Sequence, residues 1–396
     1  MRASRIRIEE RHEGAALCAD ITSRVGGLTD FPLYIQFAGM EPDQLVANGD
    51  AFVPALLWAS MKLGEDLEIE APISRELYEN TEAIQSMAAE WFPGMRRVRL
   101  EADCRPPLRP ASGSGLFLSC GVDSSFSLMR RRGSLTHLLS SSGFDLDAGG
   151  EKNFGWLRQS ALNMGNETGL QVVLVHTNLR AVLNRYLPWG YCGFSLGPAT
   201  VGLAAQGFLG RCTVAADRHY SQLTPQPCNP VMDGLWSAEN LTFVFDGFDM
   251  WRLEKVRRIA GWDCALTNLR VCLDPTAHNC GVCEKCIRTM LELHVLGALD
   301  RTPAFKSKLT AARIAEIRLA AAGTMSYYTE ILEAMGDSAV DRAYAAAIRR
   351  ALRKGRMRLL YYGLRKRVGS APGGAAGLKA LDKAAAWYSG SPGSRS

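Results

Sequence analysis

The segment Leu116–Ser125 constrains the fold more than any other part of the chain. It reads LFLSCGVDSS, an apolar run that ends in small residues and leads into the helical pattern Ser125–Met129. This order predicts a buried strand, a tight loop and a helix that starts directly after the loop. Loop N–H groups and a helix N-terminus favour phosphate, so the segment predicts a nucleotide site. An ordinary strand–turn–helix with a Ser/Asp cap is the alternative.

Small and polar residues make up this loop and the first helical turn. Asp123 stands where a carboxylate caps free N–H groups and lies close to a magnesium ion bound with the nucleotide. Cys120 has two interpretations, a reactive thiol of lowered pKa at the helix N-terminus or a small packed hydrophobic residue. The residues expected to hold the phosphates are Ser119, Gly121, Val122, Asp123, Ser124 and Ser125.

The loop resembles the PP-loop of the ATP pyrophosphatase family. The family pattern Ser-Gly-Gly-x-Asp-Ser is matched at Ser119, Gly121, Asp123 and Ser124, with Cys120 in place of the first glycine. The resemblance implies that ATP is split between its α- and β-phosphates, the loop holding pyrophosphate while a substrate oxygen attacks the α-phosphorus. The kinase-like motif Gly-x-x-x-x-Gly-Lys-Ser/Thr does not occur in the sequence.

A second signal is a cluster of four cysteines within fifteen residues. The spacing is C-x7-C-x2-C-x2-C, which allows the sulfurs to converge on one tetrahedral zinc. An iron–sulfur cluster uses the same ligand type, and disulfides are the other alternative, although no secretion signal is apparent and reduced thiols are expected. His278 is interpreted as a bystander. The expected ligands are Cys272, Cys280, Cys283 and Cys286.

The loop and the cysteine cluster together are similar to the 7-cyano-7-deazaguanine synthase family. That family has the order C…CGxCxxCxxR, to which the four cysteines, Gly281 and, by its place after the last cysteine, Arg288 correspond. The resemblance covers residues 112 to 296. Residues 142–147 differ from the substrate loop of the family, so the resemblance implies adenylating chemistry and leaves the deazapurine substrate open.

Apolar runs alternate with helical patterns in this part of the chain. Strands are expected at 136–140, 171–176 and 212–216, with a helix at 156–167 between the first two. The alternation predicts an α/β fold with a doubly wound parallel sheet, and the resemblance implies the adenine nucleotide alpha hydrolase-like type. Ligands bind at the carboxyl ends of such strands, where Ser119, Ser140 and Thr177 would share one rim.

The sequence predicts that the chain is divided into three segments. Residues 1–108 read as an N-terminal α+β domain, 109–300 as the PP-loop domain with its zinc site, and 301–396 as a helical basic region. The Pro-rich stretch 105–110 and the following residues 111–115 predict a linker between the first two. A Gly/Ser/Pro-rich tail ends the sequence, with a short helix expected near 378–387.

Several polar residues are candidates for catalysis. Lys255, on an expected charged helix, would neutralise phosphate charge in the transition state, or belongs to a solvated helix face. Arg288 is a second candidate cation, and Cys120 a candidate thiol. His219, in a polar turn after a strand, is either an acid/base or a structural residue.

Composition limits the class of protein. The 396 residues are 47% hydrophobic, which supports a substantial core, and the longest apolar stretch, at 51–63, is too short to span a bilayer. A cytoplasmic location is expected. Residues 349–367 hold nine Lys/Arg and no acid, so without them the net charge of +6 becomes 6 − 9 = −3. This helix would bind tRNA or an anionic membrane surface, or forms a solvated face.

The leading hypothesis is an AMP-forming ligase that uses ATP, magnesium and zinc. It would adenylate a carboxylate or amide oxygen of a small molecule for attack by ammonia or an amine. One alternative is sulfur transfer to tRNA, with Cys120 or another thiol as the carrier. Another is a zinc-stabilised nucleotide-binding protein without turnover. Assembly as a homodimer is left open.

Overall fold

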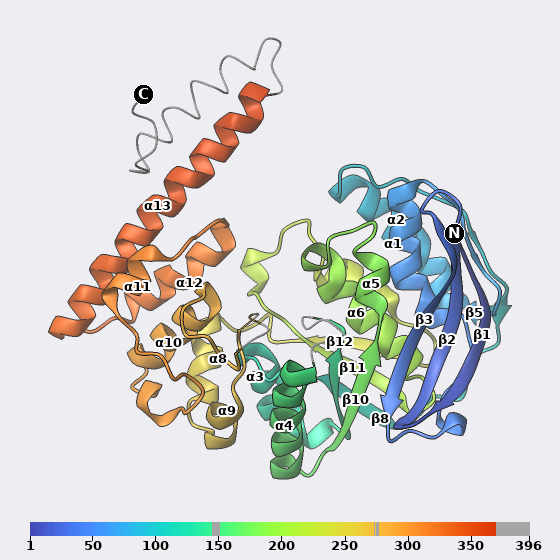
Figure 1. Cartoon of the computed structure of the whole chain (residues 1–396), viewed down its shortest axis with the longest axis horizontal. Helices are drawn as coiled ribbons and strands as arrows, with labels where there is room; N and C mark the ends of the chain where they lie inside the picture. Colours follow the sequence, from blue (N-terminus) through green and yellow to red (C-terminus); the bar gives the residue numbers. More distant parts are fainter. Residues whose placement is uncertain (145–150, 273, 275–276, 370–396) are drawn as a thin grey trace. The chain divides into compact units, whose positions relative to one another are not determined.

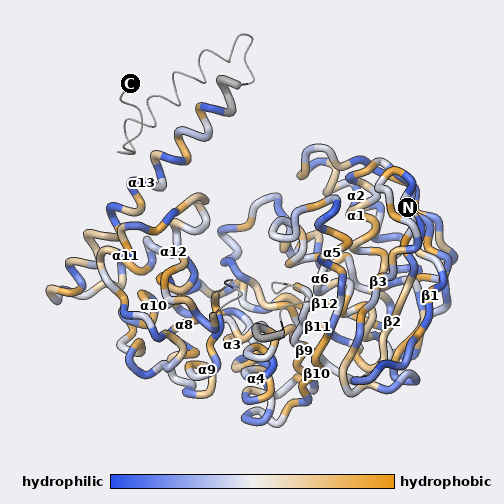
Figure 2. Tube along the Cα trace, viewed as in Figure 1, coloured by the Kyte–Doolittle hydropathy of each residue, from blue (hydrophilic) through white to orange (hydrophobic). Residues whose placement is uncertain are grey.

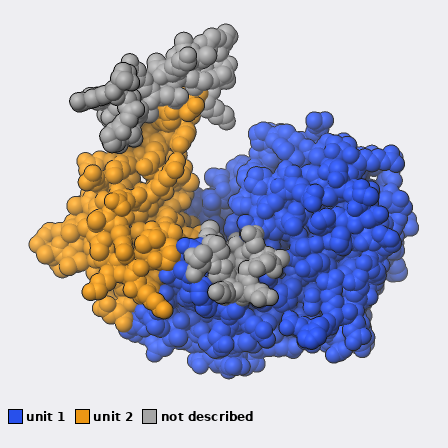
Figure 3. All heavy atoms as spheres, viewed as in Figure 1, with its two compact units in different colours: residues 1–279, 301–304 blue, residues 280–300, 305–396 orange. Residues whose placement is uncertain are grey.

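The computed structural model describes residues 1–144, 151–272, 274 and 277–369. The chain forms two compact units, residues 1–279 with 301–304, and residues 280–300 with the described residues from 305 onward (Figure 3). The boundaries of these units differ from those of the expected segments 1–108, 109–300 and 301–396. The reason is that strands before and after residue 108 belong to the same sheet.

The first unit is built on a ten-stranded, mostly parallel sheet (Figure 1). Its order is β12-β11-β8-β9-β10-β3-β2-β1-β4-β6. Adjacent strands from β12 to β10 are parallel, and β10-β9-β8-β11-β12 is the 3-2-1-4-5 order of doubly wound sheets. The strands expected at 136–140, 171–176 and 212–216 correspond to β9, β10 and β11. The bounds are β8 Gly113–Phe117, β9 His137–Ser142, β10 Gln171–Thr177, β11 Leu209–Ala215 and β12 Thr242–Asp246.

The order of these strands fixes a switch point between β8 and β11. Connections leave the two neighbouring strands in opposite directions, which leaves a space at their carboxyl ends where ligands bind in such sheets. The loop after β8 and the turn after β11 both lie at this edge. The helices that follow the strands are α3 Val122–Arg131, α4 Glu151–Thr168, α5 Leu179–Leu183, α6 Trp189–Ala204, α7 Pro230–Asp233, α8 Arg252–Ile259 and α9 Asp263–Asn268.

The N-terminal strands extend the same sheet. β3 pairs antiparallel with β10, with Phe37 opposite Val175, and β2 and β1 continue the antiparallel order. Phe37, Trp58 and Val175 belong to one continuous hydrophobic core. The segment 1–108 therefore shares its core with the parallel strands. The bounds are β1 Arg2–Arg11, β2 Gly14–Ser23, β3 Leu28–Ala38, β4 Leu67–Ile69 and β6 Leu100–Glu101, a separate pair β5 Ile73–Ser74 and β7 Cys104–Arg105, and the helices α1 Val53–Leu63 and α2 Arg75–Trp91.

The expected linker at 105–115 is anchored rather than loose. The side chain of Arg105 is 8% exposed and lies 2.6 Å from the fully buried carboxylate of Asp50. The same guanidinium donates to Gln206 and Asn240. Because a buried cation needs such partners, this network fixes the segment to the core, and β8 begins at Gly113.

The second unit is helical, as expected for the C-terminal region. Its core contains Ile287, Met290, Ile314, Tyr328 and Ile348, contributed by all four α-helices. The helix expected near 378–387 lies outside the described residues. None of the helices that the structure describes is long and apolar enough to cross a membrane. The bounds are α10 Glu284–Val295, α11 Ala311–Glu316, α12 Ala322–Glu333 and α13 Ala339–Gly369.

Candidate functional site

The loop between β8 and α3 forms the centre of the site. Leu118 N–H donates to Leu139 O at 2.8 Å, so the strand pairing continues to the start of the loop. Gly121 is the N-cap of α3, with extended backbone and no side-chain cap. The α3 N-terminus therefore directs backbone N–H groups and partial positive charge into the loop.

The serines of the loop have different environments. Ser119 is exposed, and its hydroxyl lies 3.1 Å from that of Ser124, whose oxygen also accepts from Ser119 N–H. Ser125 is fully buried, and its hydroxyl has no hydrogen-bond partner among the described residues. Of the expected phosphate-binding residues, Ser119 is exposed, Gly121 and Asp123 are half-buried, and the side chains of Val122, Ser124 and Ser125 are buried.

Cys120 occupies a backbone conformation that favours glycine. Its φ is +56°, in the left-handed region. The side chain is fully buried, and burial raises the pKa of the thiol to about 12. Of the two interpretations of Cys120, the thiol thus fits the packed hydrophobic residue and not the reactive thiol of lowered pKa.

Two cations from α8 meet the first turn of α3. Lys255 Nζ and an Arg252 guanidinium nitrogen each lie 3.1 Å from a carboxylate oxygen of Asp123. Lys255 is 1% exposed and also donates to the carbonyl of Ala216, at the end of β11. Lys255 is therefore not part of a solvated helix face but lies beside the first turn of α3.

A glycine leaves the space that Lys255 occupies. Gly247, directly after β12, has a φ of +100°, and a Cβ there would lie 3.3 Å from both Cε and Nζ of Lys255. Sequence reasoning missed Arg252, although its position three residues before Lys255 places it on the same helix face. Asp123, expected beside magnesium, is held by these two cations instead.

Other predicted rim residues have structural partners. Thr177 lies at the end of β10 and its hydroxyl donates to Tyr34 O in β3, and Ser140 lies within β9 with its side chain fully buried. Of the three residues expected at one rim, only Ser119 is exposed. Gly143, directly after β9, has a φ of +90°, and a Cβ at this position would lie 1.9 Å from Thr177 O, so no other residue fits there without a shift of the backbone. Residues 145–147 of the expected substrate-loop segment lie outside the described residues.

Aromatic side chains follow β11 and β12. The His219 ring stacks on Trp251 at 4.4 Å and 8°, and Tyr220 stacks on Phe248 at 5.4 Å. His219 Nδ1 also accepts from Ser221 N–H and caps a short 3-10 helix, which agrees with its structural interpretation. Trp251 and Tyr220 are exposed, so each pair presents an aromatic surface at this edge of the sheet.

The four predicted metal ligands converge. The sulfurs of Cys272, Cys280, Cys283 and Cys286 all lie within 4.8 Å of one another. Cys280 Sγ and Cys286 Sγ are 4.0 Å apart, too far for a disulfide and close to the separation of about 3.8 Å that two thiolates have on one tetrahedral zinc. The residues thus fit a single metal ion such as zinc, and the group does not include His278.

Backbone and amide groups position the sulfurs. The N–H groups of Val282 and Cys283 donate to Cys280 Sγ at 3.5 and 3.3 Å. The Asn279 amide accepts from the backbone N–H groups of Val271 and Cys272 and donates to two carbonyls. Sequence reasoning missed Asn279, because its role depends on the folded position of the segment.

The segment that leads to Cys272 also contacts the loop. Arg270 N–H donates to Cys120 O at 2.8 Å, and Arg270 O would lie 3.6 Å from a Cβ on Gly121. The loop is therefore held by residues that immediately precede the first cysteine of the cluster. Arg288, the other expected catalytic cation, is buried in the second unit, where it pairs with Glu284 and its guanidinium covers the Tyr327 ring at 4.4 Å.

Comparison of the chain with protein-family models, curated proteins and solved structures finds no match. The functional interpretation therefore depends on the residues and on their geometry.

Proposed function

We propose that this chain is an ATP-dependent ligase of the PP-loop type, which forms AMP and pyrophosphate as the 7-cyano-7-deazaguanine synthases do. The observation that supports it is the placement of two buried cations, Lys255 and Arg252, at the first turn of α3, beside a loop that leads into a helix N-terminus without a side-chain cap at the switch point of the sheet. Phosphate binding at helix N-termini of such sheets follows from this charge distribution.

In this proposal, ATP supplies an α-phosphorus for attack by a carboxylate or amide oxygen. Backbone N–H groups from Gly121 onward would hold the pyrophosphate part, with the exposed Ser119 hydroxyl at the loop. Lys255, Arg252 and Asp123 together carry a charge of 2 − 1 = +1, which would offset the charge that develops on the leaving group. The loop residues thus bind and orient, and α8 stabilises charge.

Magnesium and zinc differ in how the residues fit them. Magnesium binds through one or two carboxylates and the phosphates themselves, so Asp123 would have to exchange at least one of its cations for the metal. The four cysteines fit zinc as they stand. Zinc in this position would supply a fixed fold around 272–286, with no part in the reaction.

The alternatives of a tRNA sulfur transferase and of a nucleotide-binding protein without turnover are less well supported. In the sulfur transferase, Cys120 as the carrier would have to act from a fully buried position, where burial raises the pKa of its thiol to about 12, so another thiol would have to carry the sulfur. In the proposed reaction the buried cations would lie beside the charge that develops on the leaving group, a role that a binding-only protein would not need.

The test is incubation of the full chain with α-labelled ATP, magnesium, ammonia and a panel of small carboxylates. We expect AMP and pyrophosphate with at least one of the carboxylates. Lys255→Met should lower the rate of AMP formation by about 100-fold or more, the magnitude typical of a lost charge-stabilising group. Arg257→Gln, on the exposed side of the same helix, is the matched control and should leave the rate within about twofold.

Two results would contradict the proposal. ADP as the product would show cleavage between the β- and γ-phosphates. Bound ATP that is never converted with any carboxylate would support a binding-only protein.

A further inference from the structure

Helix α13 has two halves with different surroundings. In the first half, Ile348, Ala351 and Leu352 are buried in the core of the second unit. The second half extends beyond α11 and α12 (Figure 1). From residue 356 to residue 365 most described side chains of the helix are exposed. The helix therefore presents a long surface that the described part of its own unit does not cover.

An apolar stripe follows this surface. Met357, Leu360 and Leu364 are 52%, 63% and 48% exposed, and their spacing of three and four residues places them on one helix face. Figure 2 shows apolar and polar residues alternating along this helix. A purely solvated helix face would not place three large apolar side chains in one row, so the stripe indicates an interaction surface.

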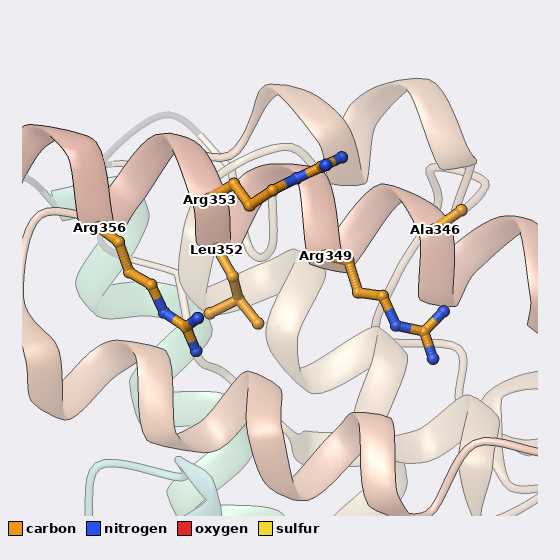
Figure 4. A pocket seen from close by; sticks show the side chains of 5 residues that line it. All are labelled: Ala346, Arg349, Leu352, Arg353 and Arg356. Atoms are coloured by element: carbon orange, nitrogen blue, oxygen red, sulfur yellow. The ribbon is translucent and has the colours of Figure 1, made fainter.

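Cations border the stripe on both sides. Arg356 lies on one flank of the stripe, and Arg349 and Arg353 precede it, Arg353 in line with Met357 and Leu360 by helical spacing. These three arginines line a hollow of about 450 Å³ together with Leu352 and Ala346 (Figure 4). On the other flank Lys354 and Arg365 are exposed, with the Lys354 ammonium donating to Ala315 O at 3.4 Å, and Arg358 between them is half-buried. Long cationic side chains beside an apolar stripe reach outward to anionic groups while their stems contact apolar surface.

We propose that the outer face of α13 lies in the surface of an anionic lipid bilayer. Met357, Leu360 and Leu364 would enter the boundary between headgroups and acyl chains, and the flanking arginines and lysine would bind lipid phosphates and carboxylates. The helix would lie in the plane of the surface. This association does not depend on the proposed ligase activity.

Charge distinguishes this occupant from the nearest alternatives. Residues 349–367 contain nine cations and no acid, so a second copy of the helix would bring like charges together. Residues 370–396 contain three cations and one acid, a charge of 3 − 1 = +2, and would not neutralise the face either. RNA would satisfy the cations, but its binding would leave the apolar stripe unexplained.

The test is sedimentation of the full chain with vesicles of 70% phosphatidylcholine and 30% phosphatidylserine at 0.15 M salt. We expect binding to these vesicles and at least about tenfold weaker binding to pure phosphatidylcholine. The double variant Leu360→Gln/Leu364→Gln keeps residues of good helix propensity and should weaken binding by about tenfold or more. The triple variant Arg353→Gln/Lys354→Gln/Arg356→Gln should do the same.

Matched controls are Val25→Gln, at an equally exposed apolar position, and Arg97→Gln/Arg99→Gln, at exposed cations. Both should bind as the unaltered chain does, and circular dichroism should show the same helix content for all variants. Absence of vesicle binding, or binding that Leu360→Gln/Leu364→Gln leaves unchanged, would overturn the proposal. Retention of RNA at low salt without vesicle binding would overturn it in favour of a nucleic-acid surface.

Discussion

At the scale of single residues, Cys120 is a test of how the loop tolerates a side chain. We expect Cys120→Gly to change the free energy of unfolding by less than about 1 kcal/mol. Glycine relieves the strain of the left-handed backbone, about 1–2 kcal/mol. This gain offsets the loss of the buried thiol side chain and the larger conformational entropy of glycine in the unfolded chain. Cys120→Val should cost about 2 kcal/mol or more, since a β-branched residue is poorly compatible with a φ of +56°. Urea unfolding measures both.

Cys212→Val is the matched control for this pair. Cys212 is also fully buried, but it lies within β11, where extended backbone suits valine. Its loss of stability should be about 1 kcal/mol or less. Equal losses for the two valine variants would show that volume, and not backbone conformation, limits position 120.

The sequence predicted some site residues and not others for identifiable reasons. Asp123, Lys255 and the four cysteines were predicted because each belongs to a local pattern, a motif or a charged helix. Asn279 and the stacked Trp251 were not, because their partners are distant in sequence or depend on loop conformation. Arg252 was predictable in principle from its helical spacing to Lys255.

At the scale of elements, the contact between α6 and α7 makes stability depend on pH. The carboxylate of Asp233 in α7 accepts from the Ser195 hydroxyl of α6 at 2.7 Å, and burial raises its pKa to about 7. The folded chain therefore holds this proton more tightly than the unfolded chain does. The stability that this proton contributes is complete below about pH 4 and is lost as the pH rises to about 7.

Asp233→Asn removes the titration and keeps an oxygen acceptor for Ser195. We expect the stability gained by this variant to be larger at pH 8 than at pH 5 by about 2–3 kcal/mol. Urea unfolding at the two pH values measures the difference. The exposed carboxylate of Asp103 is the control, and Asp103→Asn should change stability equally at both pH values. A gain for Asp233→Asn that is independent of pH would contradict the assignment.

The elements themselves were largely predictable, and their assembly was only partly so. The alternation of apolar runs and helices predicted the parallel strands and the α/β class. The antiparallel junction of β3 with β10 left no local signal, because Phe37 and Val175 are far apart in the sequence. The buried ion pair of Arg105 with Asp50 could not be predicted either, because the two residues are far apart in the sequence. The Pro-rich stretch that contains Arg105 was therefore interpreted as a linker.

At the scale of the whole molecule, the cysteine cluster and the loop are coupled by a short stretch of backbone. Arg270 N–H donates to Cys120 O, and Cys272 follows two residues later with its N–H fixed by Asn279. Because a bound metal would hold Cys272 in place, it should also hold the hydrogen bond that fixes the loop. A defect at the metal should therefore spread to the β8–α3 loop.

We expect purified protein to contain about one zinc per chain, and chelation to lower the free energy of unfolding by several kcal/mol. Chelation should also speed amide hydrogen exchange at 118–122 and 269–272. Cys283→Ser should reproduce both effects, whereas Cys104→Ser, a half-buried cysteine outside the cluster, should retain zinc and normal exchange. Iron and sulfide in place of zinc would indicate the cluster alternative, because metal analysis separates the two. Exchange in the loop that is unchanged after zinc is removed would show that the cluster stabilises only its own segment, and that the loop is held by the α8 cations alone.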